Sequence, residues 1–122
     1  MVRVAGQVLE PAGLASVRLA VAQLGTRVVV VLGHEACGAV QAALAPGRDE
    51  AFASLVEPIR RRIASVETSK ALTEEDATRG NVVATVRELR AFLERDSGID
   101  PEEVVVAGAV YSLRTREVEW LN

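Results

Sequence analysis

The chain has 122 residues, a length typical of one domain, and we expect residues 1–122 to form a single domain with a substantial hydrophobic core. The formal charge of −3 at pH 7 argues against nucleic acid as a main partner. The sequence has no apolar run near the roughly 20 residues of a membrane span, and no signal peptide opens it. Its single cysteine cannot form an internal disulfide, so we expect a cytoplasmic protein.

The first third of the chain predicts a strand, a helix and a second strand. Residues 1–6 form a short β-prone run that ends at a glycine. Apolar residues at helical spacing predict a helix over residues 10–25, with Gly25 at its C-cap. The valine-rich residues 26–32 are apolar on both faces, which predicts a strand buried on both sides as in parallel sheets.

Helices are predicted for the middle of the chain. Residues 39–45 and 50–66 have helical patterns, and Pro58 is expected to kink or break the second of these helices. A longer helix is expected over residues 73–98. Thr73 is its predicted N-cap, with Asp76 at the position of a capping-box acid.

Two further strands are expected at the C-terminal end. Residues 102–111 predict a second fully buried strand. Residues 115–122 alternate apolar and acidic side chains, which is typical of an edge strand or hairpin partner. The order of elements predicts an α/β fold with a mostly parallel sheet flanked by helices and a C-terminal edge strand.

The only histidine and the only cysteine, His34 and Cys37, directly follow the valine-rich strand. In open α/β sheets, functional groups gather beyond the carboxyl ends of the strands. Gly33 and Gly38 flank the pair, and we expect them to let the backbone turn sharply and approach its neighbours closely. If a helix begins near Ala36, its dipole favours the thiolate form of Cys37.

Imidazole and thiolate are ligands that zinc prefers, so the pair indicates a metal site. A lone cysteine is as often a small buried core residue, and that packing interpretation stays open. A catalytic zinc site usually has three protein ligands, so a further ligand here must be Asp, Glu or a group of another chain. Thiol chemistry, with Cys37 as a nucleophile or redox sensor beside His34, is another alternative.

Three segments together resemble the β-class carbonic anhydrases. The first, "GHEACGAV" at residues 33–40, resembles the zinc-binding signature G-H-x-x-C-G. The second, "VRVAGQV" at residues 2–8, resembles the family's R-N-A-G-N-V segment. The third, "VVVAGAVYSLRTREVEWL" at residues 104–121, resembles closing strands of the form G-x-x-Y-D-x-x-T-G-x-V. The likeness covers nearly the whole chain in one order.

The resemblance implies a β-carbonic-anhydrase-like fold and site. His34 and Cys37 would be ligands of one zinc ion, and Arg3, Gly33 and Gly38 would support the site. The family reaction is the reversible hydration of CO2 to bicarbonate and a proton. Family members are usually dimers or larger assemblies, so we expect a homodimer or higher oligomer.

One family segment has no match in this sequence. A strand ending in C-x-D-x-R normally precedes the R-N-A-G segment, and it supplies a further zinc ligand and an Asp–Arg pair. We therefore expect an N-terminally shortened domain with an incomplete site, inactive alone. One alternative is an active carbonic anhydrase whose N-terminal zinc-ligand segment is missing from this sequence. Another is a non-catalytic oligomer in which two copies of His34 and Cys37 form a structural Cys2His2 zinc site.

Two other groups are candidates for binding a ligand: a carboxylate for a metal ion and an arginine run for an anion. Glu35 lies between the predicted ligands and could reach a metal, although a side chain so placed more often points into solvent. The run Arg60–Arg62 could bind an anion such as bicarbonate, but a solvated helix face is the more common role for such a run.

Overall fold

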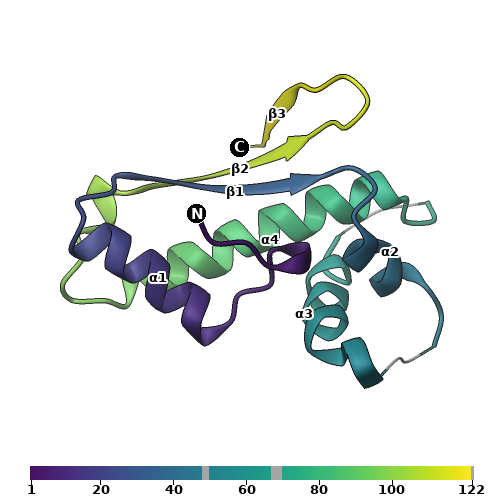
Figure 1. Ribbon diagram of the computed structural model, residues 1–122, viewed down its shortest axis with the longest axis horizontal. Helices are drawn as coiled ribbons and strands as arrows, with labels where there is room; N and C mark the ends of the chain where they lie inside the picture. Colours follow the sequence, from purple (N-terminus) through teal and green to yellow (C-terminus); the bar gives the residue numbers. More distant parts are fainter. Residues whose placement is uncertain (48–49, 67–69, 122) are drawn as a thin grey trace.

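The computed structural model describes residues 1–47, 50–66 and 70–121. A sheet of three strands lies over the helices, which occupy one of its sides (Figure 1). The strands are β1 (Val28–His34), β2 (Val105–Tyr111) and β3 (Val118–Leu121), in the order β1-β2-β3. β1 and β2 are parallel, whereas β3 is antiparallel to β2. The expected α/β fold with a C-terminal edge strand is confirmed, and the sheet is mixed.

The helices of the described residues follow the predicted order. They are α1 (Pro11–Ala22), α2 (Gly38–Leu44), α3 (Ala53–Ile63) and α4 (Glu74–Glu94), with short 3-10 helices η1 (Ala5–Gln7), η2 (Glu50–Phe52) and η3 (Pro101–Glu103). None of these helices is both long and apolar enough to cross a membrane.

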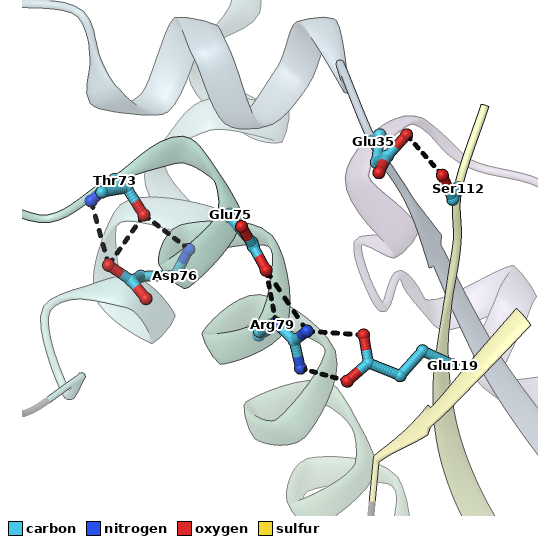
Figure 2. A network of polar contacts seen from close by, with 7 residues as sticks. All are labelled: Glu35, Thr73, Glu75, Asp76, Arg79, Ser112 and Glu119. Atoms are coloured by element: carbon cyan, nitrogen blue, oxygen red, sulfur yellow. Dashed lines mark hydrogen bonds and ion pairs between the residues drawn. The ribbon is translucent and has the colours of Figure 1, made fainter. Parts of the chain in front are cut away.

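The predicted start of α4 is confirmed in detail. The backbone N–H of Asp76 donates to the Thr73 hydroxyl over 3.1 Å, and the Thr73 N–H donates to the Asp76 carboxylate over 3.2 Å (Figure 2). This reciprocal capping box satisfies two donors that a helix start otherwise leaves unpaired. The helix ends at Glu94, four residues before the expected Gly98, whose N–H binds the Asp96 side chain instead.

The buried side chains form two clusters that meet along α4. One lies between the sheet and the helices α1 and α4, and the other joins α2 and α3 to the N-terminal segment. The first includes Val21, Val31, Val82, Val86, Leu89, Leu93, Ile99 and Val106. The second includes Val8, Cys37, Val40, Ala43, Val56, Ile59, Ile63 and Ala77. Both clusters are almost entirely aliphatic, as the scarcity of aromatic residues requires.

The prediction that the valine-rich strand is buried on both faces is wrong. Val28, Val30 and Leu32 of β1 are 58%, 43% and 51% exposed, whereas Val31 between them is buried against the helices. The reason is that the helices of the described residues lie on one side of the sheet (Figure 1). Val105 at the start of β2 is 57% exposed, so the expectation of full burial fails there as well.

The β-prone run at residues 1–6 does not form a strand. Its end is the 3-10 helix η1, in which Gly6 has a left-handed φ of 62°. The Gly6 carbonyl accepts a hydrogen bond of 3.0 Å from the Asn81 amide of α4. Val4 and Val8 on either side pack against the cluster of α2 and α3. Helix packing therefore outweighs the local strand preference of this segment.

Pro58 neither ends nor breaks the third helix, which continues from Ala53 to Ile63. Pro58 is the sixth residue of α3. Its missing N–H costs one hydrogen bond to the carbonyl of Ser54, close to the helix start. The cluster beneath α3, which contains the fully buried Ile59, compensates for that single loss.

The run Arg60–Arg62 is not the solvated helix face that its charge suggests. The Arg60 guanidinium donates to the carbonyls of Ala43, Ala45 and Gly47 at the end of α2, at 2.8–3.0 Å. Arg62 is 5% exposed and pairs with Glu88 of α4 at 2.8 Å. Two of the three guanidinium groups therefore join helices, and only Arg61 is exposed.

Candidate metal centre

The predicted ligands lie on either side of a two-residue turn at one end of the sheet. His34 is the last residue of β1, and Cys37 is the N-cap of α2. The carboxyl ends of β1 and β2 lie side by side, with His34 in register with Tyr111. The turn residues Glu35 and Ala36 therefore project beyond the parallel strands, where α/β folds place their functional groups.

The His34 ring is held by the backbone of the next residue. Its Nδ1 lies 2.7 Å from the Glu35 carbonyl oxygen. Because a carbonyl can only accept, Nδ1 carries the proton in this contact. A ring with its one proton on Nδ1 has its lone pair on Nε2, which is the arrangement of a metal-ligating histidine whose other nitrogen donates to a carbonyl. The His34 residue is exposed.

Cys37 has a different environment. It is 6% exposed and belongs to the aliphatic cluster of α2 and α3, together with Val40 and Ile59. This is the placement that the packing interpretation expects. Cys37 also occupies the N-cap position of α2, where its side chain makes no capping hydrogen bond.

The donor types fit zinc, but the number of donors is incomplete. An imidazole with a free Nε2 and a thiol at a helix start are suitable zinc ligands. Among residues 1–47, 50–66 and 70–121, no group of three or more His, Cys, Asp or Glu side chains could hold a metal ion. The described residues thus contain no complete catalytic set of zinc ligands.

Glu35 neither points freely into solvent nor joins a cluster of metal ligands. Its carboxylate accepts a hydrogen bond from the Ser112 hydroxyl at 2.9 Å (Figure 2). It also accepts one from the Arg114 N–H at 3.3 Å. The Ser112 hydrogen bond is the main reason that the pKa of the Glu35 carboxyl lies below its ordinary value. The β2–β3 hairpin is thereby attached to the turn between the predicted ligands. Sequence reasoning could not find this contact, because its partners are 77 residues apart.

A second polar link joins the hairpin to α4. Arg79 bridges Glu75 of its own helix and Glu119 of β3, with a guanidinium–carboxylate hydrogen bond of 2.8 Å to Glu119 (Figure 2). These carboxylates raise the pKa of Arg79, with Glu119 as the larger cause. A cavity of about 890 Å³ lies between the start of α4 and the hairpin, and its wall includes Glu35 and Ala36 of the turn.

The other predicted site residues have distinct surroundings. Gly33 lies against α4, since a Cβ added there would be 2.5 Å from Val82 Cγ2. Gly38 shows neither the close approach nor the special backbone expected of it: an added Cβ would meet nothing within 4 Å, and it is the first residue of α2. Arg3 is exposed in the segment before η1.

Comparison with known proteins decides the family. A family model described as carbonic anhydrase matches residues 1–118. The wild-type β-carbonic anhydrase CafD of Aspergillus fumigatus has the same fold, with a TM-score of 0.66 and 21% identity over 95% of this chain and 69% of that one. The chain belongs to the β-carbonic anhydrase family.

Further β-carbonic anhydrases share the fold or part of the sequence. A structure from a study of two tetrameric β-carbonic anhydrases of Sordaria macrospora has a TM-score of 0.67 and 18% identity, over 97% of this chain and 65% of that one. Carbonic anhydrase 2 of Mycobacterium tuberculosis is 51% identical over 49 residues. That match covers 40% of this chain and 24% of its relative, so the chain matches about a quarter of that protein's length.

Proposed function

We propose that this chain is a zinc-binding protein of the β-carbonic anhydrase family in which His34 and Cys37 hold the metal. We further propose that residues 1–122 form one domain and that these two ligands do not sustain CO2 hydration by themselves. The observation that carries the proposal is the His34 ring at the end of β1, with Nδ1 bonded to a carbonyl and Nε2 free, three residues before the N-cap cysteine.

The family reaction converts CO2 and water into bicarbonate and a proton. Zinc supplies its chemistry by lowering the pKa of a water molecule toward ~7. The contribution of this chain is binding and positioning: Nε2 of His34 and the Cys37 thiolate are the donors, and Glu35 fixes the turn between them. Two donors leave a zinc ion without the three protein ligands that a catalytic site usually has, which is why we expect no activity from these groups alone.

A second candidate is a structural zinc site shared between two copies of the chain. Two copies of His34 and Cys37 would supply the four protein ligands of a closed tetrahedral site. Two exposed apolar side chains favour an assembly: Leu32 and Trp120 lie in register on either side of Ala109, which is itself fully buried. Leu32 and Trp120 are 51% and 60% exposed, and a second copy of this chain is the occupant that we propose for this surface.

Zinc content and native mass, measured together on the 122-residue chain, separate these functions. The principal proposal predicts about one zinc per chain, and no hydration of CO2 above that of free zinc. The shared site predicts half a zinc per chain and a mass of at least about twice 13.0 kDa. Substitution of Cys37 by alanine is expected to remove the metal in both cases.

Two results would contradict the principal proposal. Zinc-dependent hydration by the wild-type chain that Cys37→Ala abolishes would show an active carbonic anhydrase. A chain that binds no zinc would leave Cys37 as a packing residue. The cytoplasmic location and the absence of a nucleic-acid partner stay predictions from composition.

A further inference from the structure

Three separate groups of Glu35 form hydrogen bonds: its backbone N–H, its carbonyl and its carboxylate. Its backbone N–H donates to the Tyr111 carbonyl of β2 at 3.0 Å. Its carbonyl accepts the Nδ1 proton of His34. Its carboxylate accepts the Ser112 hydroxyl and the Arg114 N–H, as Figure 2 shows for Ser112. The residue that holds the predicted zinc ligand is therefore itself held from the hairpin.

The hairpin end that binds Glu35 is well ordered by its own hydrogen bonds. Ser112 donates its N–H to the Glu117 carbonyl at 2.9 Å, and its carbonyl accepts the Arg116 N–H at 2.9 Å. The Ser112 hydroxyl accepts the Thr115 N–H at 3.2 Å while it donates to Glu35. The single proton of the Ser112 hydroxyl is therefore donated to the Glu35 carboxylate, because the hydroxyl accepts the Thr115 N–H with a lone pair.

The turn between the predicted ligands also contains a strained residue. Ala36 has a left-handed φ of 52°, a conformation that costs energy for any residue with a Cβ. Such a residue persists only where its surroundings fix it on both sides. The carboxylate of Glu35 fixes one side, and the helix start at Cys37 fixes the other.

We propose that Glu35 is the positioning residue of the metal site: its carboxylate clamps the turn to Ser112 of the hairpin, so that its carbonyl holds the His34 ring with Nε2 free. This inference rests on the proposed zinc site. It assigns to Glu35 a role through His34 rather than contact with the metal, and it makes Ser112 part of the same arrangement. Loss of either side chain removes the Ser112–Glu35 hydrogen bond while the Glu35 N–H still holds the turn, and we expect the ring then to rotate and exchange tautomers more readily.

Titration of Co2+ alone into the 122-residue chain, followed by the thiolate-to-cobalt absorption band, tests the inference. Glu35→Ala and Ser112→Ala are expected to weaken Co2+ binding by about 10-fold, the usual cost of losing an outer partner of a ligand. Glu35→Gln keeps an oxygen acceptor for Ser112 and Arg114, so its affinity is expected to stay close to that of the wild type. Glu119→Gln is the matched control, since it loosens the same hairpin from α4 without touching the turn.

A second measurement needs no metal. The chain has one histidine, so the 15N signals of its ring are unambiguous. In the wild type we expect the neutral ring to carry its proton on Nδ1, and in Glu35→Ala we expect a mixture of both tautomers. Glu119→Gln should keep the wild-type signals. A role limited to hairpin stability would not change the tautomer.

The outcomes distinguish this inference from the zinc site itself. Co2+ binding that is lost in His34→Ala and Cys37→Ala but unchanged in Glu35→Ala would overturn the positioning role and leave the proposed function intact. Equal weakening by Glu119→Gln and Glu35→Ala would also overturn it, because hairpin stability would then be the cause. If His34→Ala and Cys37→Ala bind Co2+ as well as the wild type, the proposed function fails. An unchanged ring tautomer in Glu35→Ala overturns the positioning role, whatever Co2+ affinity is measured for that variant.

Discussion

Zinc at 100 times its Kd is expected to raise the free energy of unfolding of the wild-type chain by about 2.7 kcal/mol, and Cys37→Ala or His34→Ala should abolish that gain. A ligand that binds the folded chain more tightly than the unfolded chain stabilises it, and folding fixes the two donors at the end of β1 and the start of α2. Urea unfolding followed by circular dichroism, with and without zinc, measures the effect.

His34→Ala is the more specific test of the zinc effect among these two variants. Its side chain is exposed, so its removal should change the stability of the zinc-free chain very little. Cys37→Ala also removes a buried sulfur from the cluster of α2 and α3 and should lower stability in both conditions. Arg61→Ala, an exposed change on α3, should keep the full zinc effect. The same zinc-dependent gain in wild type and His34→Ala would contradict the metal site.

Gly33→Ala is expected to lower the free energy of unfolding by about 1–3 kcal/mol, the usual cost of overpacking. The added Cβ would lie 2.5 Å from Val82 Cγ2, and Val82 is fully buried in the cluster beneath the sheet. β1 or α4 must therefore shift. The midpoint of urea unfolding, converted with the slope of the transition, gives the value.

Gly38→Ala is the matched control on the other side of the turn. Nothing lies within 4 Å of the Cβ that it would add, and the residue is helical. Alanine there should raise stability by about 0.4–1 kcal/mol, since it reduces the freedom of the unfolded chain. Equal effects of Gly33→Ala and Gly38→Ala would show that β1 does not pack closely on α4.

Much of the fold follows from local patterns. The valine runs of β1 and β2 identify the parallel pair, and the alternation after residue 115 identifies β3. Thr73 and Asp76 mark the start of α4 because a capping box depends on residues only three apart. Gly25 has a left-handed φ of 70°, but it is not the C-cap that its position predicts, because α1 ends at Ala22 and its C-cap is Gln23.

The failures arise where tertiary contacts outweigh local pattern. An apolar run such as Val28–Leu32 shows that both faces of the strand are apolar. It does not show that other elements of the fold cover both faces. Residues 1–6 favour a strand locally, but the Asn81 amide and the helix cluster hold Gly6 in a turn. A run of arginines suggests a solvent-exposed helix face, but the Arg62 side chain forms an ion pair with Glu88 of another helix.

The candidate site could be predicted only in part. A short signature identifies His34 and Cys37, because a histidine and a cysteine three residues apart after a strand form a compact pattern. The partners of Glu35 come from the hairpin, 77 and 79 residues further along the chain, and no local spacing points to them. Local sequence patterns do not distinguish a cysteine that packs in the core from a cysteine that binds a metal, because the same residue at the same position suits both roles.

The most direct test of the zinc site is X-ray absorption at the zinc edge of the zinc-loaded chain. We predict one sulfur at about 2.3 Å and at least one imidazole nitrogen at about 2.0–2.1 Å. The sulfur should disappear from the spectrum of Cys37→Ala. A zinc shell made only of nitrogen and oxygen in the wild type would contradict the account, because it would leave the thiol as a core side chain.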